Sequence, residues 1–177
     1  MNNYRKPTKH ELTTIRRSFS KWGVFEYFRN KALTIKTSCK KIRQVYLLST
    51  DLVEIRQESL YSGLYIGVLG KYLSPSIQLA QIIAKESIKF SYVKVNRKAE
   101  SLVIYGRDVF GDSIVEYSVS NENEVVIILN THREAIGLGI TRHDSTSITS
   151  KGKVTVTTIA DIGQYIRKEK CPLDETV

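Results

Sequence analysis

The sequence has few of the residues that build metal sites, disulfides and catalytic triads. Its 177 residues include 2 Cys and 3 His. Cys39 and Cys171 belong to no C-x-x-C pair, so we expect two free thiols rather than a disulfide framework or a zinc ribbon. His10, His132 and His143 are too scattered for a metal site, and no G-x-S-x-G motif marks a nucleophile. We therefore expect no metal, no cofactor and no catalytic residues.

Long apolar runs are also lacking. The most apolar region, residues 59–84, is interrupted by Lys71 and Pro75, so no uncharged stretch of about 18 residues could span a bilayer. The first 17 residues are charged and do not resemble a secretion signal. These features predict a cytoplasmic protein with no membrane contact. The hydrophobic content of 41% predicts a packed core.

Two glycine-containing segments fall short of phosphate-binding motifs. In "GVLGK", residues 67–71, Tyr65 stands where a Walker A loop needs glycine, and Tyr72 stands where it needs Ser or Thr. The apolar surroundings also differ from the exposed G-x-x-G loop of a KH domain, so we expect close backbone packing there. "AIGLGI", residues 135–140, lacks the third glycine of a dinucleotide fingerprint and is expected to be a bent strand.

Positive charge is concentrated in one part of the chain. Residues 1–43 hold 12 Lys and Arg against 2 Glu, whereas the remainder holds 15 basic and 16 acidic residues. Such a basic segment predicts a partner that carries phosphates. The alternative is a solvated helix face that serves solubility.

The first half is expected to form an α/β unit with three or four strands. Thr8 and Glu11 have the spacing of a capping box, and Gly23 offers a stop to the helix that follows. The apolar residues at helical spacing within it are Leu12, Ile15, Phe19 and Trp22. Residues 33–48 read as a hairpin with Lys40 and Lys41 near its tip. A short helix capped by Ser49 or Thr50, a strand over residues 60–73 and a helix opening at Pro75 and Ser76 complete the unit.

The second half has a different residue pattern, typical of short strands. It contains five short strand candidates about ten residues apart: "FSYVKV", "SIVEYSV", "EVVIILN", "AIGLGI" and "KVTVTTI". This even spacing predicts a small sandwich or barrel. No Gly, Ser or Pro run separates the halves. We place the domains at residues 1–90 and 91–170, followed by a tail at 171–177.

The second half resembles a PUA domain, the RNA-binding module of pseudouridine synthases and archaeosine transglycosylases. The residues that carry the likeness are "VNRKAESLVIYGRDVFGDSIVEYS" and "VVIILNTHREAIGLGIT". The closing "ADIGQYIRK" is similar to the C-terminal signature of large-subunit ribosome-assembly factors of the Nip-seven type. The order of elements in the first half is consistent with the same family.

The resemblance implies an α+β protein, with an N-terminal α/β domain of mainly antiparallel sheet and a C-terminal PUA-type small β-barrel. It implies an RNA-binding factor, not an enzyme, that acts in rRNA processing and large ribosomal subunit assembly. Such a factor would bind single-stranded or U-rich RNA of rRNA precursors through basic residues of its PUA domain. Expected partners are ribosome-assembly or RNA-processing factors, with the exosome as a candidate. The compact chain looks like an archaeal form, and we expect a monomer.

The family's basic cluster maps onto particular positions of this sequence. By that resemblance the RNA-binding candidates are Arg107, Arg142, His143, Lys151, Lys153, Arg167 and Lys168. Auxiliary contacts to RNA or to a partner are expected from Lys9, Arg16, Arg17, Lys21, Lys40, Lys41 and Lys71. Within the closing signature, Asp161 is expected to cap a short helix and Gly163 to permit close packing. Residues 91–177 carry 11 basic and 12 acidic side chains, so we also consider that RNA contacts both halves.

Two other functions stay open at this point. In one, the basic N-terminal face docks an acidic protein and the chain has little RNA affinity of its own. In the other, a PUA domain is appended to an RNA-modifying enzyme. The enzyme is disfavoured because Asp51 is the only aspartate before residue 108, and the first half offers no other catalytic set.

Overall fold

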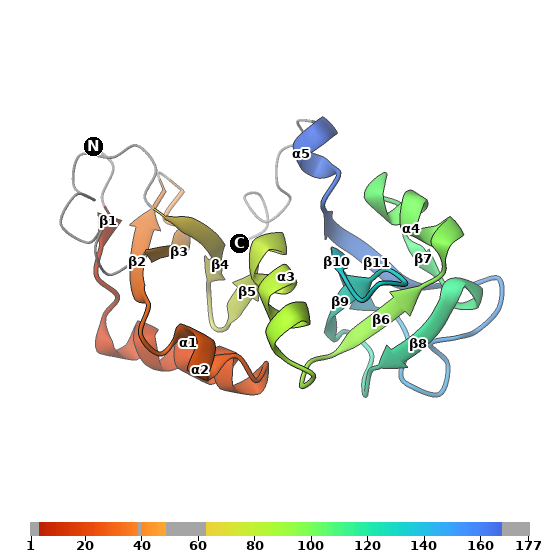
Figure 1. The fold of residues 1–177 in the computed structure, drawn as a ribbon, viewed down its shortest axis with the longest axis horizontal. Helices are drawn as coiled ribbons and strands as arrows, with labels where there is room; N and C mark the ends of the chain where they lie inside the picture. Colours follow the sequence, from red (N-terminus) through yellow and green to blue (C-terminus); the bar gives the residue numbers. More distant parts are fainter. Residues whose placement is uncertain (1–3, 39, 49–62, 168–177) are drawn as a thin grey trace. The chain divides into compact units, whose positions relative to one another are not determined.

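The computed structural model describes residues 4–38, 40–48 and 63–167 (Figure 1). The chain forms two compact units, Met1–Leu79 and Ala80–Thr176, and each is built on one β-sheet. The α+β class predicted from the sequence is confirmed. The division between the units falls within helix α3 (Ile77–Glu86), and the domain limit at residue 90 stays a prediction. Cys39, Cys171 and the helix predicted after Ser49 or Thr50 lie outside the described residues.

The first unit contains a five-stranded sheet in which every neighbouring pair of strands is antiparallel. The expectation of three or four strands was too low, because the outermost strands have only two and three residues and are too short for a sequence pattern. Its strands follow chain order: β1 (Tyr4–Arg5), β2 (Ala32–Thr37), β3 (Arg43–Leu48), β4 (Leu64–Leu69) and β5 (Leu73–Pro75). The predicted hairpin is β2 and β3, closed by the pair Thr37 and Arg43. Lys41 takes a positive φ of 62° in the connecting turn, so the hairpin places Lys40 and Lys41 at its exposed tip.

Helix α1 (Lys9–Lys21) begins at the predicted capping box. The Thr8 side chain accepts from the Glu11 backbone N–H at 3.3 Å, and the Glu11 carboxylate accepts from the Thr8 N–H at 2.8 Å. Ile15 and Phe19 are buried on its apolar face. The Phe19 ring stacks at 4.3 Å on Phe28, which belongs to the short helix α2 (Phe25–Phe28). This stacking joins the two helices.

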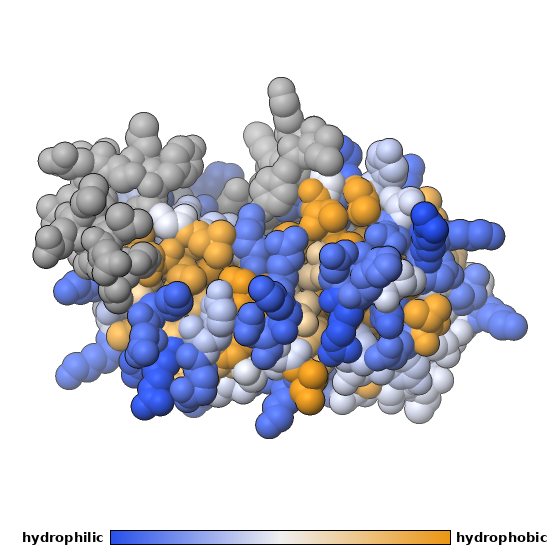
Figure 2. All heavy atoms as spheres, in the orientation of Figure 1, coloured by the Kyte–Doolittle hydropathy of each residue, from blue (hydrophilic) through white to orange (hydrophobic). Residues whose placement is uncertain are grey.

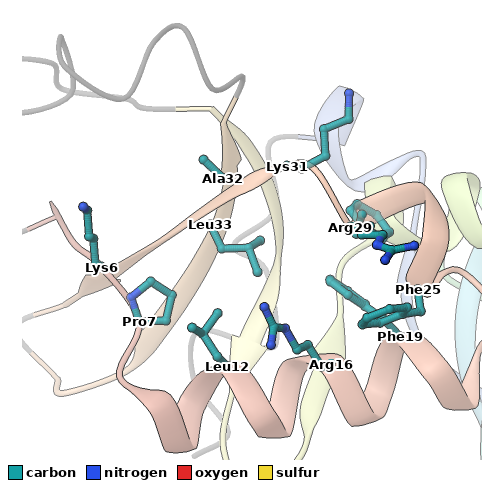
Figure 3. Close-up of a pocket in the computed structure, with 11 residues that line it drawn as sticks. Lys6, Pro7, Leu12, Arg16, Phe19, Phe25, Arg29, Lys31, Ala32 and Leu33 are labelled. Carbon is teal, nitrogen blue, oxygen red and sulfur yellow. The ribbon is translucent and has the colours of Figure 1, made fainter.

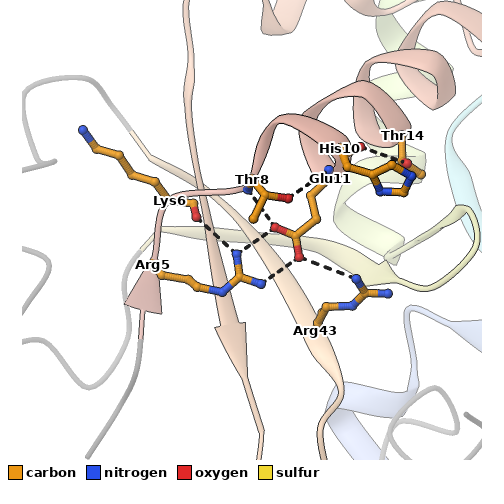
Figure 4. A network of polar contacts seen from close by, with 7 residues as sticks. All are labelled: Arg5, Lys6, Thr8, His10, Glu11, Thr14 and Arg43. Atoms are coloured by element: carbon orange, nitrogen blue, oxygen red, sulfur yellow. Dashed lines mark hydrogen bonds and ion pairs between the residues drawn. The ribbon is translucent and has the colours of Figure 1, made fainter.

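Glu11 also connects α1 to the sheet (Figure 4). Its carboxylate accepts two hydrogen bonds of 2.7 Å from Arg5 of β1 and lies 3.5 Å from a guanidinium nitrogen of Arg43 of β3. The hydrogen bonds from Arg5 are the main cause that lowers the Glu11 pKa from its ordinary value of 4.5 to about 2. Two of the twelve N-terminal cations therefore serve the fold of this unit.

Close backbone contact explains the first glycine of "GVLGK", Gly67. Gly67 of β4 has a φ of +146°, and a Cβ built on it would lie 2.1 Å from the Ser74 carbonyl oxygen. The close packing predicted for the glycines of this segment is confirmed at Gly67 but not at Gly70, where an added Cβ would lie at an ordinary 3.8 Å from the Tyr72 carbonyl oxygen.

Farther along the chain, the Ser76 hydroxyl accepts from the Leu79 N–H at 3.2 Å and so caps α3. The helix begins at Ile77, and Pro75, which was expected to open it, belongs to β5.

The second unit contains a six-stranded sheet in the order β7-β11-β10-β9-β6-β8. Its strands are β6 (Tyr92–Val95), β7 (Val109–Phe110), β8 (Ile114–Ser118), β9 (Val125–Leu129), β10 (Ala135–Thr141) and β11 (Val154–Asp161). Although β7 and β8 stand at opposite ends of this order, only the 3-10 turn Gly111–Ser113 separates them in the chain. The sheet must therefore curl until its two edges approach each other.

One apolar core fills the curled sheet. Val109 of β7 and Ile114 of β8 share a buried cluster with Val126 of β9 and Val156 of β11. Helix α4 (Arg97–Ile104) adds Val103 to it. Its first turn is capped by the Asn96 side chain, which accepts from the Ala99 N–H at 3.0 Å. This arrangement is the small barrel that the strand spacing predicts, and it agrees with the PUA-type barrel that the resemblance implies.

Candidate nucleic-acid interface

Four cations of the second unit lie along one edge of the curled sheet, and we call them the cationic edge: Arg107, Arg142, Lys151 and Lys153. All four side chains are exposed. Arg107 precedes β7, Arg142 follows β10, and the two lysines lead into β11. Because β11 pairs with both β7 and β10, the sheet gathers these three chain segments.

Arg142 is held at this edge by side chains from two neighbouring segments. Its backbone N–H donates to the Thr155 carbonyl at 2.8 Å, and its Nε donates to the Thr157 hydroxyl. The guanidinium also lies 3.3 Å from Asp108 Oδ2, while Asp108 Oδ1 accepts from the Thr158 N–H at 3.0 Å. Asp108 thus orients Arg142 and anchors the residues next to β7 to the middle of β11.

The turn before β11 presents the two lysines. Among the described residues, neither Lys151 nor Lys153 takes part in an ion pair, so both ammonium groups are available to an anion. The Lys153 carbonyl accepts from the Gly111 N–H at 3.0 Å, and Phe110 pairs with Val154 across β7 and β11. Phe110 is exposed. An exposed ring beside cations is a combination typical of surfaces that bind single-stranded nucleic acid.

His143 and Asp144 lie in the turn that leaves the cationic edge. His143 is half-buried. The Asp144 carboxylate accepts from the Thr146 hydroxyl at 2.7 Å and from the backbone N–H groups of Thr146 and Ser147. The Thr146 hydroxyl is the main cause that lowers the pKa of Asp144. This ionised carboxylate reduces the positive potential of the turn, while its hydrogen bonds keep the turn ordered.

Arg167 takes part in the fold itself. Its Nη2 lies 2.8 Å from the buried Asp161, and its Nη1 donates to the Ile104 carbonyl at the end of α4. Gly163 permits this arrangement, because a Cβ there would lie 2.0 Å from the Ile104 carbonyl oxygen. Asp161 accepts from the Gly163 N–H at 2.7 Å, at the start of the short helix α5 (Gln164–Arg167). An RNA contact by Arg167 stays a prediction, and Lys168 lies outside the described residues.

The auxiliary cations of the first unit are exposed but not gathered at one place. Helix α1 carries four of them along its length: Lys9, Arg16, Arg17 and Lys21. Arg16 lines a groove beside α2, whereas Arg17 and Lys71 line a separate hollow of about 270 Å³. Lys71 Nζ lies 5.6 Å from the Tyr72 ring centre, within range of a cation–π contact. Lys40 and Lys41 stand at the hairpin tip.

Several participants at the cationic edge were not predicted from the sequence. They are Asp108, Phe110, Thr157 and Thr158. Asp108 and Phe110 belong to the "GRDVF" segment, so the position next to Arg107 was a usable signal. Thr157 and Thr158 gave no such signal, because their segment "KVTVTTI" has the β-branched composition of any strand.

No group of three or more His, Cys, Asp and Glu within the described ranges could hold a metal ion. In the same part of the chain, no helix is long and apolar enough to cross a membrane.

The curled six-stranded sheet has the fold of a PUA domain. A family model described as the UPF0113 PUA domain matches residues 91–170. A conserved PUA-domain protein from Thermoplasma acidophilum is similar in fold over 94% of this chain and 99% of its own, with a TM-score of 0.69 and 19% sequence identity.

Curated relatives extend the match to the first unit. The chain is 32% identical over 171 residues to a UPF0113 protein from Archaeoglobus fulgidus, covering 94% of this chain and 96% of the relative. A UPF0113 protein from Aeropyrum pernix is 24% identical over 143 residues, or 78% of this chain and 76% of that one. The chain belongs to the UPF0113 family.

Proposed function

We propose that this protein binds single-stranded or U-rich RNA through the cationic edge of its PUA domain. The observation that carries the proposal is the grouping of Arg107, Arg142, Lys151 and Lys153 around β11, with Phe110 exposed beside them. Cations that meet phosphates release counterions, and an exposed ring offers a surface on which a base can stack.

The biological setting of the proposal is rRNA processing and assembly of the large ribosomal subunit in an archaeal cytoplasm. Its support is the resemblance of "ADIGQYIRK" to the Nip-seven signature and the archaeal origin of the two relatives. In this setting the protein acts without catalysis on rRNA precursors. Assembly or processing factors, with the exosome as a candidate, contact it through the first unit.

Two measurements test this function. Fluorescence anisotropy with a 12-nucleotide uridine RNA should give an affinity that falls steeply between 50 and 200 mM salt. Crosslinking in cells, followed by sequencing of the attached RNA, should enrich precursor rRNA of the large subunit. The proposed role is contradicted if the protein shows no salt-dependent RNA binding, or if its crosslinks lie outside rRNA precursors.

A second candidate is a protein-interaction adaptor with little RNA affinity of its own. The observation that favours this adaptor is the charge of residues 1–43, which include 12 basic residues and only 2 Glu. The RNA titration separates the two candidates, because the adaptor should show little affinity for the 12-nucleotide uridine RNA while its partners survive nuclease treatment in a pull-down.

A further inference from the structure

A groove of about 530 Å³ runs along the first unit between α1, α2 and the start of β2 (Figure 3). Pockets that enclose small ligands or a few side chains usually measure about 300–1,000 Å³. Leu12 and Arg16 project into the groove from α1, and Leu33 faces them from β2. The groove therefore combines an apolar floor with charged walls.

The charges around the groove all have one sign. Lys6 lies at one end, Arg29 and Lys31 at the other, and Arg16 between them (Figure 3). No carboxylate is among the described residues that line it. Lys6 and Arg16 form no ion pair within the described part of the chain. Arg29 pairs at 3.2 Å with Glu26, but both side chains are exposed, so water screens this pair.

The floor of the groove keeps apolar side chains in partial contact with solvent. Leu12, Phe25 and Leu33 are half-buried, and the buried, stacked rings of Phe19 and Phe28 line the same groove. The space-filling view shows apolar side chains at the surface of this unit, bordered by hydrophilic ones (Figure 2). An apolar floor with a polar rim is typical of surfaces that receive side chains of another protein.

We propose that this groove binds an acidic segment of a partner protein. One or two bulky apolar side chains of that segment sit on Leu12, Phe25 and Leu33, and flanking Asp or Glu residues meet Arg16 and Lys31. The inference deepens the proposed function and rests on it for the identity of the partner as an assembly or processing factor. The binding itself requires only the groove.

The chemistry of the lining favours a peptide over a nucleotide. Its polar side chains are all Lys or Arg, which donate hydrogen bonds but cannot accept them. A base seated on this floor would leave its own N–H donors without side-chain acceptors, which is costly in a desolvated site. An apolar side chain has no such requirement. A second copy of this chain is also a poor occupant, because it would bring a like-charged unit to the groove.

The first experiment identifies what the groove selects. Random 12-residue peptides are selected by display on the full-length protein, and the recovered peptides are then measured against Arg16→Glu/Lys31→Glu. We expect recovered peptides to share a bulky apolar residue flanked by Asp or Glu, and to bind the double variant about tenfold more weakly. Peptides without this pattern, or with equal affinity for the double variant, overturn the proposal.

A matched control separates the groove from general charge. Arg97→Glu/Lys98→Glu makes the same change in net charge at two exposed cations of α4 that do not line the groove. We expect it to weaken peptide binding by no more than about twofold. An equal loss in both double variants means that the peptides follow net charge and overturns the proposal.

The second experiment distinguishes a failure of this inference from a failure of the proposed function. Methyl NMR signals of Leu12 and Leu33 are followed while the full chain is titrated with a recovered peptide and, separately, with the 12-nucleotide uridine RNA. We expect the peptide to shift both signals and the RNA to leave them in place while still binding to the protein. Shifts caused by RNA alone make the groove an RNA site and overturn the inference, whereas absence of any RNA binding contradicts only the proposed function.

Discussion

The Arg142 guanidinium lies 3.3 Å from Asp108 Oδ2 at the edge where β7 meets β11. The Arg142 side chain is 52% exposed, so this ion pair contributes little to stability. Its effect is on the site, because it fixes the direction of the guanidinium and also neutralises part of its charge. A phosphate that approaches Arg142 must compete with the carboxylate.

Asp108→Asn should therefore strengthen RNA binding. The amide oxygen of Asn can still accept from the Thr158 N–H, which Asp108 Oδ1 does at 3.0 Å, so the local fold is retained. Removing one negative charge beside a bound phosphate is worth about 1 kcal/mol, or an affinity gain of roughly fivefold. Anisotropy with the 12-nucleotide uridine RNA at 100 mM salt measures the gain.

Glu134→Gln is the matched control for Asp108→Asn. It removes one charge at the opposite end of β10 from Arg142 and keeps the carbonyl that accepts from Asn130 at 2.8 Å. An equal gain in both variants would mean that only net charge matters. Weaker binding by Asp108→Asn would mean that the orientation of Arg142 outweighs its charge.

The turn lysines should set the salt dependence of RNA binding. In Lys151→Ala/Lys153→Ala the affinity should fall, and the slope of log affinity against log salt should become shallower by about 1.4, because each phosphate contact to a single strand contributes about 0.7. Lys85→Ala/Lys89→Ala removes two exposed lysines away from the cationic edge and should leave the slope unchanged. Identical slopes in the two double variants would exclude Lys151 and Lys153 as phosphate contacts.

The contact between Arg167 and Asp161 should affect stability rather than RNA affinity. The two side chains are 21% and 5% exposed, so Arg167→Met leaves a buried carboxylate without its cation. We expect a loss of about 3 kcal/mol in the free energy of unfolding, measured by urea titration, with RNA affinity at 20 °C within about twofold of the wild type.

A second substitution gives this prediction its internal check. Asp161→Asn in the Arg167→Met background removes the unpaired charge and keeps an acceptor for the Gly163 N–H, so part of the lost stability should return. Reduced RNA affinity in Arg167→Met without any loss of stability would instead make Arg167 a direct RNA contact.

Local signals in the sequence were sufficient for much of the fold. The capping box of Thr8 and Glu11, the β2–β3 hairpin and the backbone role of Gly67 each depend on residues near one another in the chain or on one steric rule. The five strands expected in the second half are all present, because their β-branched composition and turn spacing repeat.

Contacts between distant segments could not be predicted in the same way. Asp108 and Arg142 meet only because β11 pairs with both β7 and β10, and nothing local to either residue indicates this pairing. The basic composition of residues 1–43 predicts a partner with phosphates, and this stays a prediction. Composition alone does not indicate that Arg5 and Arg43 are paired with Glu11, or that Arg16 and Lys31 line the same groove.

Glu11 should make stability depend on pH in the acidic range. Its pKa is about 2 in the folded protein against an ordinary 4.5, so its contribution is complete above pH 4.5 and is lost as the pH falls towards 2. The shift corresponds to roughly 3 kcal/mol. Glu11→Gln should therefore be less stable than the wild type at pH 7, and the difference should shrink steadily between pH 4.5 and pH 2. Urea unfolding at pH 7, 4 and 3 measures this difference in the free energy of unfolding.

The control is Glu26→Gln, which alters an exposed ion pair. Its free energy of unfolding should stay close to that of the wild type throughout this pH range. A constant difference between Glu11→Gln and the wild type across this range would show that Glu11 stabilises the unit through packing rather than through its charge.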